Sequence, residues 1–235
     1  MDTDEVSTKM EQIATNARNM PQVRFTSLAY HIDKRWLYEA YKATRKSGAT
    51  GVDEQTAEEY ARNLGENLSL ALEQLKSGRY KAPPVKRVYI PKEDGGKRPI
   101  GITTFGDKEM QRALYWVMNP VYEQDFYGCS YGFRVNRSQH DAIKALWRGL
   151  MQMKGAWIID LDIKKFYDTI EWKYLREILK LRVRDGVLVR MIGKWMNAGI
   201  MKEGKGIAYP EEGIQQGGVI SPLLSNIFLH EVLDK

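Results

Sequence analysis

The chain has 235 residues, 43% hydrophobic and 28% charged, the balance of an ordinary globular protein with one large or two small domains. No apolar run is long enough to cross a membrane, the acidic start MDTDEVSTKM lacks the core of a signal peptide, and the single cysteine, Cys129, excludes an internal disulfide, so we expect a cytoplasmic protein with no membrane partner. The net charge of +6 and the pI near 9.2 favour a polyanionic partner without proving one.

The N-terminal third is predicted to be helical. Residues 1–28 are polar and weakly periodic, so we expect a loose helix and a linker there. Apolar side chains recur at helical spacing over residues 32–46 and again over residues 56–77, where Gly78 provides a stop. We therefore predict two amphipathic helices in these ranges.

A β-hairpin is predicted next. Val88 and Ile90 lie on one arm and Ile100 and Ile102 on the other, separated by a turn over residues 93–96. The surrounding stretch carries a local charge of +5, which is about equally consistent with a site for a phosphate backbone or triphosphate and with a solvated basic surface. Two acids, Glu93 and Asp94, stand against seven cations: Arg79, Lys81, Arg98, Lys86, Arg87, Lys92 and Lys97.

Two further helices are predicted over residues 107–122 and from Ser138, where Asp141 completes a capping box. The apolar positions of the second helix predict that one side faces the core. These positions are Ile143, Leu146, Trp147 and Leu150. The apolar, β-branched run 156–163 that follows predicts a buried strand with Asp160 and Asp162 on one face.

Helical patterns return in the C-terminal third. We expect Thr169 to cap one helix, residues 187–198 to form a second, and Ser221 to cap a last one that has proline at its first position. Residues 200–214 predict another hairpin. Helices and hairpins in this order predict an α+β fold, and neither GxxxxGK[ST] nor GxGxxG is present to cradle a nucleotide.

Asp162 is the main candidate for chemistry. A carboxylate in a buried apolar strand is costly unless it is paired or binds a metal. From spacing alone, a functional carboxylate and an edge-strand aspartate paired with a nearby lysine are equally consistent with the sequence.

Five blocks in a fixed order resemble the reverse transcriptases encoded by group II introns. The first palm motif of that family is similar to DIKKFYDTI, which begins at Asp162, and the fingers hairpin is similar to IPKEDGGKRPIGI, which begins at Ile90. The other three matching stretches are AYKATRKSGATGVD from Ala40, SYGFRVNRSQHDAI from Ser130 and IQQGGVISPLLSNI from Ile214. The resemblance covers roughly residues 35–235.

This resemblance implies an RNA-directed DNA polymerase with a right-hand architecture. It implies an N-terminal polar segment over residues 1–30, fingers over 31–155 with their hairpin at 86–105, and the first part of an antiparallel palm sheet over 156–235. The partners would be an RNA template, the intron RNA, a DNA primer and a dNTP, with a maturase role in splicing. Two Mg²⁺ ions would drive nucleotidyl transfer.

The resemblance also assigns roles to single residues. Asp162 would be the catalytic carboxylate and a metal ligand, and the carbonyl of Ile163 would be a second ligand. The incoming nucleotide would be bound by Lys92, Arg98, Ile163, Tyr167, Gln216 and Gly217. Contacts with template or other RNA are expected at Lys46, Arg87, Arg134, Asn136 and Arg137.

One departure concerns the metal site. The second palm motif, x-D-D, supplies the other carboxylates of the family, and no Asp-Asp dipeptide occurs in this chain. We therefore expect the chain to stop before that motif, to be inactive alone, and to self-associate through uncovered palm surface. Two alternatives remain open: a non-catalytic, maturase-like RNA-binding module, and a diversity-generating, retron or defence-type reverse transcriptase.

Overall fold

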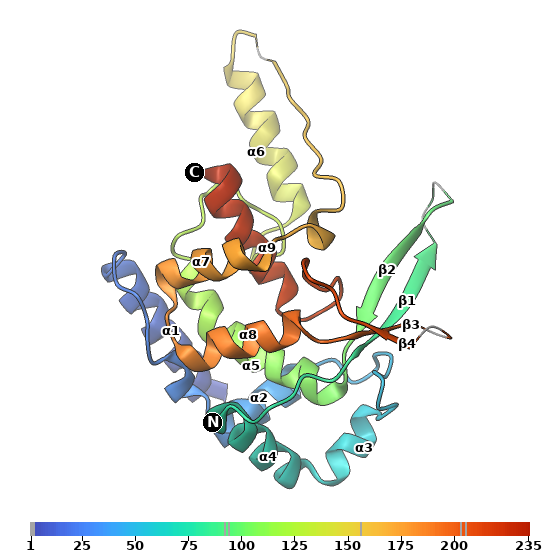
Figure 1. Cartoon of the computed structure of the whole chain (residues 1–235). Coiled ribbons are helices and arrows are strands. Elements are labelled where there is room, and N and C mark those ends of the chain that lie inside the picture. The colour runs from blue at the N-terminus through green and yellow to red at the C-terminus, as the bar shows by residue number, and fades with distance from the viewer. Residues whose placement is uncertain (1–2, 92, 94, 156, 203, 205) are drawn as a thin grey trace.

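A computed structural model describes residues 3–91, 93, 95–155, 157–202, 204 and 206–235. Figure 1 shows a helical body from which a β-hairpin and one long helix project in different directions. The α-helices are α1 (Thr3–Asn19), α2 (Lys34–Ala43), α3 (Ala57–Arg62), α4 (Leu64–Ser77), α5 (Phe105–Tyr122), α6 (Gln139–Gln152), α7 (Trp172–Arg182), α8 (Gly186–Met196) and α9 (Ser221–Leu229). Short helical turns are η1 (Leu28–His31), η2 (Phe166–Asp168) and the π-helical η3 (His230–Asp234).

Helix α5 is the centre of the body and packs against α1, α2 and α9. Leu114 and Val117 on this helix have no exposed surface, and the indole of Trp36 in α2 donates a hydrogen bond to the carbonyl of Ala113 at 3.0 Å. Helix α1 is more regular than the loose helix we predicted, because it buries an apolar stripe that includes Ile13 against this core.

The strands form one mixed sheet in the order β2-β1-β3-β4. The predicted hairpin is confirmed, with β1 (Val85–Pro91) antiparallel to β2 (Lys97–Ile102) and Val88 opposite Ile100. The second predicted hairpin, β3 (Ile200–Lys202) and β4 (Gly206–Ala208), joins this sheet because β3 runs parallel to β1. The α+β class is confirmed, although the described strands extend the fingers hairpin and do not form a separate antiparallel palm sheet.

Helix boundaries follow local capping chemistry. The helix predicted over 56–77 is broken at Asn63 into α3 and α4, and Thr56 and Glu59 form a reciprocal capping box at its start. The capping box of Ser138 with Asp141 on α6 is confirmed. Thr169 does not cap α7, because its hydroxyl donates to carbonyls behind it and the helix starts at Trp172.

Two predictions about burial were wrong. The run 156–163 is not a strand over its described residues 157–163, and the side chains of residues 157–163 are exposed, with Trp157 98% accessible. The apolar face of α6 is also exposed, including Ile143 and Trp147. A strand needs a hydrogen-bonding partner, and none of the described strands pairs with this segment. We call α6 and residues 157–165 the apolar arm, which Figure 1 shows projecting from the body.

No helix in the described part of the chain is long and apolar enough to cross a membrane.

Candidate functional site

Three segments far apart in the sequence are tied together by backbone hydrogen bonds. The amide of Gly101 in β2 donates to the carbonyl of Gln216 at 2.7 Å. The amide of Ile214 donates to the carbonyl of Tyr167 at 2.7 Å, and the amide of Gly213 donates to Ile170 at 2.8 Å. The base of the hairpin, the η2 turn and the loop 213–217 therefore form one rigid unit.

Two glycines make this close approach possible. Gly217 has a φ of +104°, and a Cβ there would lie 2.6 Å from the carbonyl oxygen of Gly101. Gly213 has a φ of +85°, and a Cβ there would lie 2.9 Å from two backbone oxygens of η2. Both conformations and both distances disfavour any residue with a side chain.

A cavity of about 740 Å³ opens beside this unit. Its lining includes Arg87 from β1, Asp168 from η2, Trp172 at the start of α7, and Gln215. A small neighbouring cavity adds Gln216 to this lining. Sequence reasoning named Arg87 and Gln216 but missed Asp168, whose only signal was its place in the DIKKFYDTI motif.

Tyr167 lies in the rigid unit, whereas Asp162 lies on the segment that leads to it. The half-buried Tyr167 packs against the core, and its hydroxyl lies 3.2 Å from the hydroxyl of Ser225 on α9. Asp162 is exposed in the irregular segment before η2. The carbonyl of Ile163 accepts a hydrogen bond from the amide of Phe166 at 3.3 Å, so it takes part in the turn that places Tyr167.

The residues present do not assemble a complete metal site. Within the described ranges, no group of three or more His, Cys, Asp or Glu side chains lies close enough to hold a metal ion. Two-metal catalysis needs several carboxylates around ions that are about 3.5–4 Å apart. The exposed carboxylate of Asp162 does not supply that set on its own.

The hairpin presents cations to solvent. Arg98 is exposed at the start of β2, opposite Ile90 on β1, and Arg87 is half-buried nearer the base. Lys92, the other cation predicted to bind a triphosphate, lies outside the described residues. The basic hairpin predicted from the sequence is thus present, with Arg98 near its tip.

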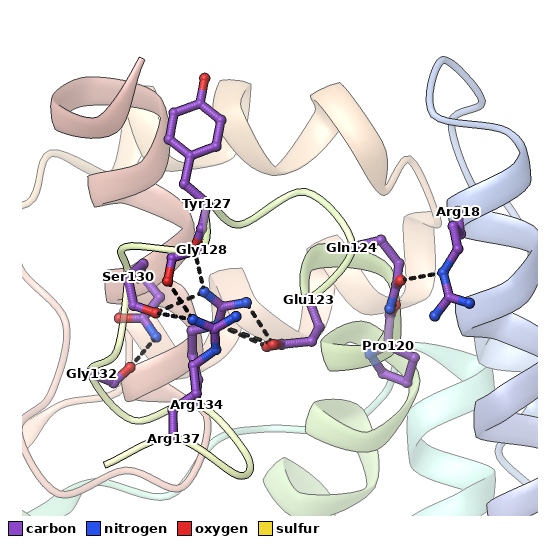
Figure 2. Close-up of polar contacts among 11 residues, drawn as sticks. Arg18, Pro120, Glu123, Gln124, Tyr127, Gly128, Ser130, Gly132, Arg134 and Arg137 are labelled. Carbon is purple, nitrogen blue, oxygen red and sulfur yellow. Dashed lines mark hydrogen bonds and ion pairs between the residues drawn. The ribbon is translucent and has the colours of Figure 1, made fainter. Parts of the chain in front are cut away.

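Arg134 holds the loop before α6 in place. Its guanidinium binds the carboxylate of Glu123 through two nitrogens, at 2.7 and 3.0 Å, and donates to the carbonyls of Tyr127 and Ser130 (Figure 2). The Arg134 side chain is only 3% exposed. An RNA contact at Arg134 would require this buried ion pair to break, which argues for a structural role instead.

The other predicted RNA contacts differ in accessibility. Arg137 donates to the carbonyl of Gly128 at 2.6 Å (Figure 2), and Asn136 is exposed with a φ of +59°. Lys46 lies 3.8 Å from the ring centre of Tyr41 and donates to the carbonyl of Thr44. The pKa of Lys46 is lowered because burial disfavours its charged form, although the nearby Glu109 acts in the opposite direction.

Two carboxyl groups are buried on α5 at the base of the hairpin. Burial raises the pKa of Asp107 to about 7, although a hydrogen bond from the indole of Trp195, at 3.1 Å, acts in the opposite direction. The hydroxyl of Tyr80 also donates to this carboxyl group. Burial likewise raises the pKa of Glu109 to about 7, partly offset by Tyr60 and Lys46.

Comparison with known proteins adds to this geometry. Residues 90–235 match the family described as "Reverse transcriptase (RNA-dependent DNA polymerase)". "Protein YkfC" of Escherichia coli (strain K12) is 36% identical over 233 residues, and "Group II intron-encoded protein LtrA" of Lactococcus lactis subsp. cremoris is 34% identical over 232 residues. Each match covers 96% of this chain, which spans 61% of YkfC and 37% of LtrA.

The fold is also found in a solved structure. A chain of the "Partial Cas6-RT-Cas1--Cas2 complex" superposes with a TM-score of 0.57 and is 23% identical in sequence. The match covers 88% of this chain and 34% of that chain. At this identity the likeness supports the fold alone.

Proposed function

Because this chain belongs to the reverse transcriptase family, we propose that it forms the fingers (31–155) and the first part of the palm (156–235) of a group II intron-encoded reverse transcriptase. Members of this family use a nucleic-acid template, a primer and dNTPs. The subclass is supported by the 34% identity to LtrA across nearly the whole chain. The parent protein would copy RNA into DNA and assist splicing of its intron RNA.

The observation that carries the proposal is the rigid unit of hairpin base, η2 and loop 213–217. It brings together Tyr167, Gln216 and the strand that leads to Arg98, three blocks separated by up to 118 positions in the sequence. A solvent-exposed guanidinium suits phosphate oxygens, a tyrosine ring suits a sugar face, and an amide side chain suits a sugar hydroxyl. An incoming nucleotide has these three parts.

Individual residues would then have the following roles. Arg98, with Lys92, would hold the triphosphate, and Tyr167 would exclude a ribose 2′-hydroxyl while it packs against the core. Gln216 would touch the sugar, and Gly217 would let backbone approach it. Contacts with RNA would come from Arg87, Lys46, Asn136 and Arg137. Arg134 would position the loop that carries Asn136 and Arg137. Asp162 would be one ligand of a magnesium site that this chain does not complete.

Binding to a primer–template duplex tests the template role of the hairpin. Fluorescence anisotropy with an RNA template annealed to a DNA primer should show weaker binding for Arg87→Gln, on strand β1, than for the wild type. Arg62→Gln is the matched control, because it removes an exposed arginine on α3, away from the hairpin. Equal affinity of both variants would contradict the proposed role of the hairpin.

Primer extension tests the metal assignment. We expect the 235-residue chain alone to make no DNA that depends on Asp162, because the other metal-binding carboxylates are missing. Robust synthesis that Asp162→Asn abolishes would contradict this expectation. The subclass is tested separately by the DNA that flanks the gene, where group II intron RNA domains are expected.

A further inference from the structure

A basic groove of about 750 Å³ runs between α7 and α8. The two helices are joined by the short turn 183–185 and lie side by side, and Figure 1 shows this turn on the side of the body away from the β1–β2 hairpin. The groove contains five cations and no acid among its lining residues. These residues are Arg176, Lys180, Arg184, Gly186, Val189, Arg190, Gly193, Lys194 and Asn197.

Helical spacing explains why the cations share one groove. Arg176 and Lys180 are four residues apart on α7, and Arg190 and Lys194 are four residues apart on α8, so each pair lies on one face of its helix. The floor between them is made of small residues. A Cβ on Gly193 would lie 3.5 Å from the guanidinium of Arg176, so the side chain of Arg176 reaches across to α8.

The five positive charges are not neutralised by neighbouring acids. None of them forms an ion pair within the described residues. Lys194 donates to the carbonyls of Gly78 and Tyr80, which hold its ammonium in place but leave its charge intact. The carboxylate of Asp185 beside the groove is buried, and its oxygens accept from three backbone amides. The charges therefore repel one another, and a polyanion would relieve this repulsion.

The groove is separate from the candidate nucleotide site. Trp172 at the start of α7 and Met196 at the end of α8 line the cavity that contains Arg87 and Gln215. The two cavities have no lining residue in common.

We propose that the α7–α8 groove binds the phosphate backbone of folded RNA, as a second contact surface apart from the template path. Three of the five cations are arginines, whose forked guanidinium pairs with phosphate oxygens. The lining offers no aromatic ring on which a base could stack, so it does not suit unpaired bases. Val189 is its only apolar anchor, so it does not suit a peptide partner either. The choice of RNA among polyanions rests on the proposed function.

Anisotropy with a labelled, blunt RNA hairpin and the 235-residue chain tests this groove. The groove variant carries Arg176→Gln, Lys180→Gln and Arg190→Gln. The control carries Arg62→Gln on α3 and Lys144→Gln and Arg148→Gln on α6, three exposed cations elsewhere, so that both variants lose the same charge. We expect the groove variant to bind at least about tenfold more weakly, and its plot of log K against log salt to flatten by about 2–3, at roughly 0.9 per phosphate contact. Circular dichroism melts should confirm that both variants fold.

Three results would overturn the proposal. Equal weakening by the two variants would show that only total charge matters. Displacement of the RNA by poly-glutamate at equal charge concentration would show that the groove accepts any polyanion. If the groove variant keeps its affinity for the RNA hairpin while Arg87→Gln loses primer–template binding, the groove assignment fails and the polymerase assignment stands. If the groove variant loses affinity for the RNA hairpin while Arg87→Gln keeps primer–template binding, the groove assignment stands and the proposed role of the hairpin fails.

Discussion

Asp107 is expected to make the folded protein less stable as the pH rises. Its carboxyl group is buried at the meeting point of α5, α8 and the segment before β1, where Trp195 and Tyr80 donate to it. The folded protein keeps the proton up to about pH 7, whereas an unfolded chain releases it near 3.8. Between these values the folded state binds more protons, so the free energy of unfolding falls as the pH increases.

The size of this effect follows from the pKa. One pKa unit corresponds to about 1.4 kcal/mol, so the difference between 3.8 and about 7 costs at most about 4 kcal/mol once Asp107 is fully ionised. About 3 kcal/mol of this cost should accumulate between about pH 5 and about pH 8. Asp107→Asn should remove that part of the pH dependence, because its amide oxygen accepts the same two hydrogen bonds without a charge.

Urea unfolding of the wild type and of Asp107→Asn at about pH 5 and about pH 8 measures the difference. Glu11→Gln, on the exposed side of α1, is the control for loss of a carboxylate. The wild type should lose stability between the two pH values relative to Asp107→Asn, and the control should follow the wild type. If Asp107→Asn loses as much stability as the wild type over this range, the carboxyl group is already ionised at about pH 5 and the reasoning fails.

Three other predictions concern the loop before α6, the rigid unit and the apolar arm. Arg134→Met should destabilise the fold by about 3 kcal/mol or more in thermal unfolding, because it leaves the carboxylate of Glu123 without its partner; an unchanged melting temperature would contradict the buried pair. Gly217→Ala should weaken primer–template binding more than Gly132→Ala, which meets nothing within 4 Å; equal affinities would show that the loop tolerates a side chain. Light scattering should show self-association that Trp157→Ser reduces, and a strict monomer at high concentration would contradict this.

Local chemistry made much of the fold predictable from the sequence. The hairpin follows from alternating side chains and a glycine turn, and the capping box at Ser138 involves residues only three positions apart. The burial of Trp147 and of residues 157–163 depends instead on which distant segments cover them, and periodicity carries no such information. Apolar periodicity therefore identified α6 correctly as a helix but misplaced its face.

The candidate site likewise combines residues that the sequence identified with contacts that only the folded chain shows. Ordered motifs marked Tyr167, Gln216 and Arg98, but only the folded chain shows that Gly101 and Gln216 are joined by a hydrogen bond. Four of the five groove cations lie on two helices, and they become neighbours only when the turn 183–185, which carries Arg184, brings the helices together. The buried pairing of Arg134 was also hidden, because its partner Glu123 lies outside the five matching stretches.

The hydrogen bond from Gly101 to Gln216 has a mechanical consequence. A force applied at the tip of the hairpin, for example by a ligand that draws Arg98 inward, acts on a lever whose base is fastened to the loop that holds Gln216. A displacement of Arg98 by one end of a bound nucleotide would then also displace Gln216 at the other end.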